Sequence, residues 1–76
     1  MTDQDFRVPP TEPVWWCATD RRTQVQVRVK HQFWSAARDM AMVELARRLE
    51  WPPEEEPMWQ RWDGDDDGNG EWVTLP

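Results

Sequence analysis

The sequence has few of the residues from which small proteins build cross-links. Among its 76 residues there is one cysteine, Cys17, and one histidine, His31. A single cysteine excludes an internal disulfide, and the two residues together are too few for a Cys/His zinc site. The lack of a cysteine framework favours a reducing, intracellular setting, so we expect a cytoplasmic protein that needs no cofactor.

Long apolar runs are also lacking. No stretch approaches the roughly 20 apolar residues of a membrane-spanning helix. The segment Met1–Pro13 is polar and contains Pro9, Pro10 and Pro13. It shows no apolar run after a basic start, so we expect neither a membrane segment nor an export signal. We interpret residues 1–13 as a flexible arm that precedes a single domain at residues 14–76.

The residues of catalysis are sparse as well. His31 has no serine, cysteine or carboxylate partner at a catalytic spacing, and Cys17 lies in an apolar run where cysteine usually behaves as a small hydrophobe. General acid–base chemistry needs a pocket that tunes a pKa, and a chain this short can scarcely build one. We therefore predict that the protein is not an enzyme.

Tryptophan, in contrast, is abundant. The chain has seven, and each buries about 150–250 Å² when it is enclosed. A few indoles at about 25 cal/mol per Å² supply much of a small core. Seven are more than so small an interior can hide, and exposed tryptophan is enriched at binding hot spots. The composition therefore indicates a binding surface.

The charge is unevenly distributed. Residues 1–49 hold eight basic and six acidic side chains, a net charge of +2. Residues 50–76 hold one basic and nine acidic side chains, a net charge of −8. Such an acidic half repels bare nucleic acid and attracts basic protein surfaces.

Hydrophobic periodicity predicts a small α+β domain of order ββαββ, with two antiparallel hairpins and one helix packed on the sheet. Residues 14–19 are short, apolar and aromatic, and residues 23–31 alternate valine with polar side chains, which is typical of strands. Residues 36–51 lack glycine and form the expected helix, with Ser35 as N-cap and Pro52 and Pro53 as the stop. Residues 58–62 and 71–75 form the second hairpin, with an acidic tip at residues 63–70.

Within the expected helix, Ala41, Leu45 and Leu49 fall on the apolar face. On the other face, Glu44 and Arg48 lie four residues apart, in the orientation that favours an ion pair.

Three interpretations of the acidic tip remain open. Asp63, Asp65 and Asp67 followed by Gly68 match the opening of an EF-hand-type calcium loop, with Glu71 as a further oxygen donor. The pattern then fails, because Thr74 stands where that loop has a bidentate glutamate. The second interpretation is a solvated hairpin tip. The third is an acidic contact surface, on which two groups of acids crowd one end of the molecule: Glu54, Glu55, Glu56, Asp63, Asp65, Asp66 and Asp67.

The second hairpin also carries three tryptophans, Trp59, Trp62 and Trp72. Residues 59 and 62 lie on opposite faces of a strand, so at least one indole should face away from the core. Either the connector or the N-terminal arm covers such an indole, or it anchors a partner next to the acids. The leading hypothesis takes the latter interpretation and assigns all three indoles to the contact surface. Arg28 and Lys30 line the outer face of an earlier strand, where a solvated surface is the expected role and direct nucleic-acid binding is not.

The leading hypothesis is a small acidic, non-enzymatic protein that binds a basic surface on a nucleic-acid-handling complex, with carboxylates that mimic phosphates. The general profile is similar to that of small phage or mobile-element proteins that disable host machinery, including anti-CRISPR proteins. That resemblance, one of type and not of motif, implies an inhibitor of viral origin. The alternatives are a calcium-responsive module that uses Asp63, Asp65, Asp67 and Glu71, and a homo-oligomer that hides tryptophan in its own interface.

Overall fold

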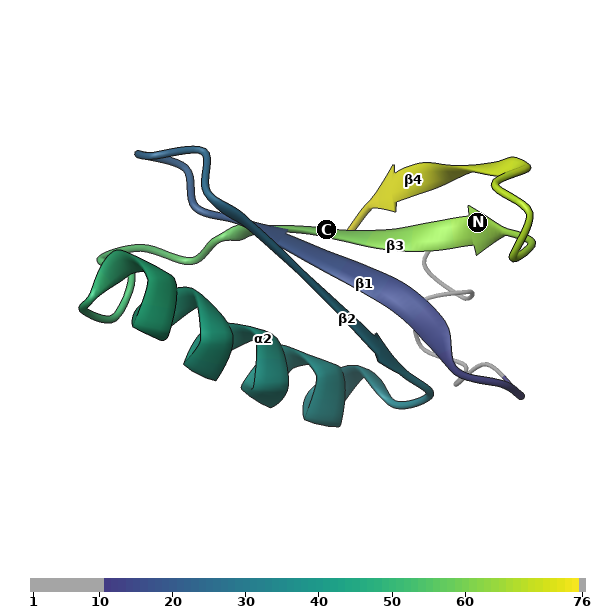
Figure 1. Cartoon of the computed structure of the whole chain (residues 1–76), viewed down its shortest axis with the longest axis horizontal. Helices are drawn as coiled ribbons and strands as arrows, with labels where there is room; N and C mark the ends of the chain where they lie inside the picture. The colour runs from purple at the N-terminus through teal and green to yellow at the C-terminus, as the bar shows by residue number, and fades with distance from the viewer. Residues whose placement is uncertain (1–10, 76) are drawn as a thin grey trace.

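A computed structural model describes residues 11–75 (Figure 1). Of the expected N-terminal arm, residues 1–10 lie outside the described part. The elements follow the order β1 (Val14–Thr19), β2 (Gln26–His31), α2 (Trp34–Leu49), β3 (Met58–Gly64) and β4 (Gly70–Thr74). The predicted α+β fold with ββαββ order is therefore confirmed. No helix within residues 11–75 is long and apolar enough to cross a membrane.

The four strands form one antiparallel sheet in the order β2-β1-β3-β4. The two hairpins, β1–β2 and β3–β4, meet along β1 and β3, where Ala18 is the partner of Trp59. The helix packs on one face of the sheet, along β2 and β1, and leaves β4 uncovered (Figure 1). The sheet therefore has a helix face and an open face.

The helix packs on the sheet through one row of small and branched residues spaced four apart, which we call the helix spine. Ala37, Ala41 and Leu45 are fully buried and Leu49 nearly so. Leu45 and Leu49 pack with Val27 of β2, while Ala41 packs with Ala18 and Trp59. Alanine at two of the four positions lets the helix approach closely enough for the sheet's indoles to fill the space beside it.

Both ends of the helix differ from expectation. Ser35 is not the N-cap, because the helix begins at Trp34 and Phe33 occupies the cap, with its carbonyl accepting a 3.0 Å bond from the Ala37 amide. The Trp34 ring packs against Trp16 and Trp59, and this packing fixes the first turn. The helix ends at Leu49 because Glu50 adopts a left-handed conformation (φ 68°), two residues before the first proline.

The first strand pair is also shorter than predicted, because Asp20 organises a turn. Its carboxylate accepts bonds from the Thr23 amide at 2.9 Å and hydroxyl at 2.7 Å. Gln24 follows with a positive φ of 66°, so β2 begins at Gln26 and not at residue 23. The predicted Glu44–Arg48 ion pair is present at 3.3 Å.

Candidate interaction surface

The fold divides the seven tryptophans by face. Three of them, Trp16, Trp34 and Trp59, form a cluster between the sheet and the start of the helix, with Trp34 between the other two at centroid distances of 5.3 and 5.0 Å. Trp51 follows the helix and is 58% exposed. The remaining three lie on the open face: Trp15, Trp62 and Trp72.

Strand alternation explains this division. Successive side chains of a strand point to opposite faces, so Trp15 faces away from the helix when Trp16 faces it. By the same rule the Trp62 side chain points to the open face, whereas those of Trp59 and Asp63 point to the helix face. Trp62 and Trp72 are partners across the β3–β4 pair, and their rings meet edge to face at 5.4 Å. The expectation that at least one indole of the second hairpin faces away from the core is confirmed.

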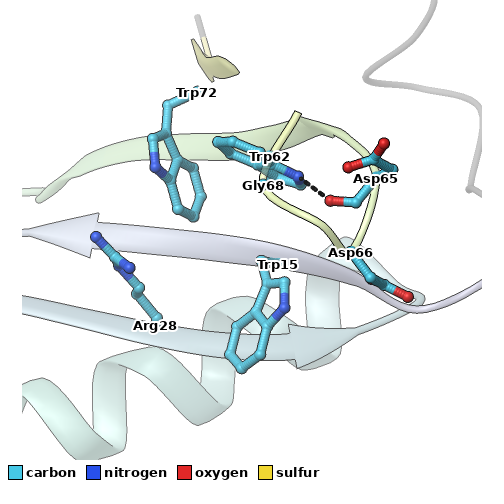
Figure 2. A pocket seen from close by; sticks show the side chains of 7 residues that line it. All are labelled: Trp15, Arg28, Trp62, Asp65, Asp66, Gly68 and Trp72. Atoms are coloured by element: carbon cyan, nitrogen blue, oxygen red, sulfur yellow. Dashed lines mark hydrogen bonds between the residues drawn. The ribbon is translucent and has the colours of Figure 1, made fainter. Parts of the chain in front are cut away.

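The three outer indoles enclose a hollow of about 250 Å³, which we call the tryptophan hollow (Figure 2). Its other walls come from the sheet and from the β3–β4 tip. Trp15 is 40% exposed, while Trp62 and Trp72 are half-buried. The lining residues are Trp15, Arg28, Trp62, Asp65, Asp66, Gly68 and Trp72.

Two cations of strand β2 lie against these indoles. The guanidinium carbon of Arg28 is 5.3 Å from the Trp72 ring centroid, and Lys30 Nζ is 5.8 Å from that of Trp15. Both distances are within the range of a cation–π interaction. Lys30 Nζ also lies 3.9 Å from an Asp66 carboxylate oxygen. The indole faces therefore already accept cations within the molecule.

The β3–β4 tip is held over the hollow by Asp65. One carboxylate oxygen accepts bonds from the amides of Asp67 at 3.0 Å and Asn69 at 2.9 Å, and the other from the Asn69 side-chain amide at 3.2 Å. The Asn69 amides, the backbone one foremost, lower the pKa of Asp65. The Trp62 indole N–H donates to the Asp65 carbonyl at 3.0 Å, so the tip is tied to the sheet (Figure 2).

The tip comprises residues 65–69 and is shorter than the predicted 63–70, because β3 extends to Gly64 and β4 begins at Gly70. The two glycines are partners, and a Cβ on Gly64 would lie 2.2 Å from the Asn69 carbonyl oxygen. This close approach leaves no room for a side chain. Gly68 adopts φ +93°, a conformation that glycine tolerates best.

The expectation that all the acids crowd one end of the molecule is wrong. Residues 54–56 precede β3 and the tip follows it, so the two acidic groups lie at opposite ends of this strand (Figure 1). A strand of seven residues is roughly 20 Å long. Glu54 pairs with Arg22 at 2.7 Å, and Glu56 pairs with Arg38 at 2.9 Å. Glu54 and Glu56 thus bind neighbouring parts of the fold, and Glu55 is exposed beside them.

Trp59 is not a surface residue either. It is 6% exposed, and its indole N–H donates to the Glu56 carboxylate. The predicted partner-contacting set is therefore divided. Trp62, Asp65, Asp66 and Trp72 line the hollow, whereas Trp59 lies in the core. Asp63 and Asp67 are exposed outside the hollow.

The carboxylates of the calcium-loop pattern do not gather into one metal site. Asp63 and Glu71 are partners across the two strands and therefore neighbours, while the Asp65 carboxylate accepts bonds within its own loop. Within residues 11–75 the structure brings together no group of three His, Cys, Asp or Glu side chains that could hold a metal ion. These residues form the tip of the β3–β4 hairpin instead.

Sequence reasoning missed Trp15 and the two cations as members of the site. The signal for Trp15 was present, since alternation alone places adjacent Trp15 and Trp16 on opposite faces. Arg28 and Lys30 were assigned to an outer strand face, but no pattern showed that this face meets Trp72 of the last strand.

The comparisons with known proteins found no matching family model, no matching curated protein and no matching solved structure.

Proposed function

We propose that this chain is a protein-binding module whose contact surface is the tryptophan hollow with the acidic β3–β4 tip. The observation that carries the proposal is the gathering of three outer indoles, Trp15, Trp62 and Trp72, around one hollow beside Asp65 and Asp66. Indoles in a central hollow with charged residues at the rim are typical of interface hot spots.

The proposed partner is a protein with a basic surface. Three consecutive aspartates, Asp65 to Asp67, lie at the tip and would steer such a surface toward the indoles. The basic surfaces of complexes that handle nucleic acid have this character, so an inhibitor that occupies such a surface is the form of the function we favour. The one cysteine, buried and free, is compatible with the cytoplasmic setting that we propose.

The test begins with capture of a partner on the immobilised wild-type chain and identification by mass spectrometry. Binding of the purified partner is then measured for Trp15→Ala and Trp72→Ala, and we expect each to weaken binding by at least roughly ten-fold, as hot-spot residues do. Trp51→Ala is the matched control, because Trp51 is exposed but lies outside the hollow. Equal losses for all three variants would contradict the proposed surface.

The charge contribution has its own test. Asp66→Asn and Asp67→Asn, combined, should slow association and flatten the dependence of affinity on salt. Asp65 is left unchanged, because its carboxylate organises the tip. An interaction insensitive to both salt and this double substitution would remove the basic partner from the proposal. A captured partner identical to the chain itself, seen as a dimer by light scattering, would point to homo-oligomerisation.

A further inference from the structure

The two ends of the tryptophan hollow differ in charge. Figure 2 shows Arg28 beside Trp72 at one end and Asp66 beside Trp15 at the other. Next to the Trp15 end, the ammonium group of Lys30 lies near both the indole ring, at 5.8 Å, and the Asp66 carboxylate, at 3.9 Å. Lys30 itself lines the adjoining depression beside Val14 and Gly64, and not the hollow. An indole face together with a carboxylate is the arrangement that recognises a cation.

Lys30 occupies this position weakly. Its side chain is 44% exposed and that of Asp66 is 90% exposed. Ion pairs of this kind contribute little to stability, because water and salt screen them and the long side chain loses entropy. A cation supplied from outside therefore competes with Lys30 at little cost.

We propose that Trp15 and Asp66, at one end of the tryptophan hollow, bind one lysine or arginine side chain of a protein partner, which displaces the ammonium group of Lys30 from its contacts with them. The inference rests on the proposed function, since it names the group of the partner that enters the hollow.

The dimensions and charges of the hollow favour this occupant. Its volume of about 250 Å³ is below the roughly 300–1,000 Å³ of small-molecule pockets and suits a single side chain. Arg28 at the far end repels a second cation and attracts a carbonyl or carboxylate of the partner. Phosphates are disfavoured because Asp65, Asp66 and Asp67 follow one another at the tip.

The experiment follows the indole N–H resonances of the full chain by NMR, since each tryptophan gives one such signal. Three capped peptides are titrated: Gly-Ser-Lys-Ser-Gly, its arginine version and its norleucine version. Norleucine is neutral and similar in shape to the lysine stem. We expect the lysine and arginine peptides to shift the signals of Trp15 and Trp72 and to leave that of Trp51 in place. The norleucine peptide should shift none of the three.

Substitutions then test the replacement of Lys30. Lys30→Met removes the internal cation and should tighten binding of the lysine peptide by up to roughly five-fold, whereas Asp66→Asn should weaken it by a similar factor. Trp15→Leu should abolish the shifts at the hollow. Equal shifts with lysine and norleucine peptides, or no gain in affinity from Lys30→Met, would overturn the inference.

Three further outcomes separate the possibilities. If an oligothymidylate shifts the hollow's indoles and the cationic peptides do not, the occupant is nucleic acid and the inference fails. If partner capture depends on Trp15 and Trp72 but none of the peptides binds, the proposed function stands while the cationic occupant is rejected. If neither capture nor peptide binding depends on these indoles, both fail.

Discussion

The guanidinium carbon of Arg28, on edge strand β2, lies 5.3 Å from the ring centroid of Trp72, on the opposite edge strand β4. The two side chains thus meet above the central strands β1 and β3. Arg28 is the β2 partner of Cys17, which is only 2% exposed although it faces away from the helix. The contact between Arg28 and Trp72 therefore covers Cys17 at the centre of the open face.

This contact predicts the reactivity of the one thiol. Arg28→Ala should expose Cys17 and lower the free energy of unfolding by about 0.5–1 kcal/mol, the contribution of an exposed cation–π contact. In native buffer, Cys17 should react with Ellman's reagent faster in this variant than in the wild type. The increase in rate should exceed the increase expected from the larger unfolded fraction alone. Arg47→Ala, an exposed arginine on the helix, is the control and should leave the rate unchanged. Equal rates for both variants would show that Arg28 does not shield the thiol.

The helix spine predicts a contrast within α2. Leu45 is fully buried against Val27 and Leu49, so Leu45→Ala should lower the free energy of unfolding by about 2–5 kcal/mol. Val43 is 63% exposed, and Val43→Ala should change the free energy of unfolding by less than about 0.5 kcal/mol. Urea denaturation followed by tryptophan fluorescence measures both. Similar losses at the two positions would mean that the helix packs on the sheet through a different face.

The Asp20 turn predicts the response of stability to acid. Bonds from Thr23, the hydroxyl first and then the amide, hold the pKa of Asp20 below its ordinary value of 3.8. A carboxyl group whose pKa is lower in the folded than in the unfolded state stabilises the fold at pH values above its unfolded-state pKa. That contribution to stability is lost as the pH falls through the folded-state pKa. Stability should therefore decline below about pH 4.

Substitution at residue 20 isolates this effect. Asp20→Asn keeps an oxygen that accepts bonds from Thr23 but does not titrate, so its stability should decline less steeply with acid than that of the wild type. Asp20→Ala removes the acceptor and should be the less stable variant at neutral pH. The measurement is the free energy of unfolding in urea between pH 3 and pH 7. Parallel acid profiles for wild type and Asp20→Asn would contradict the role of Asp20.

The hairpin tip predicts a difference between two glycines. Gly64→Ala places a Cβ 2.2 Å from the Asn69 carbonyl oxygen, so the strands must separate there and the Trp62 N–H should lose its bond to the Asp65 carbonyl. At Gly68 a Cβ meets nothing within 4 Å, and only the positive φ of 93° opposes substitution, at a cost of about 1 kcal/mol. Hydrogen exchange at the Trp62 indole N–H should accelerate more in Gly64→Ala than in Gly68→Ala. The opposite order would show that the close approach is not what closes the tip.

Local patterns in the sequence were sufficient for the elements of the fold. Valine alternation at positions 25, 27 and 29 predicted a strand, and the glycine-free stretch after Ser35 predicted the helix, because side-chain periods of 2 and 3.6 residues are read directly from the chain. Element ends were less predictable. They depend on a carboxylate that organises a turn at Asp20 and on an indole, Trp34, that must reach the core.

The sequence by itself determined that seven tryptophans exceed what the interior can hide and that the acids follow the helix. It also contained the alternation that separates Trp15 from Trp16. Only the tertiary structure decided which indoles meet, because that depends on the strand order β2-β1-β3-β4 and on side chains that reach across two strands. The separation of Glu54 to Glu56 from the Asp65–Asp67 tip, in contrast, already followed from the strand predicted at residues 58–62, since an intervening strand keeps its two ends apart whatever their charges.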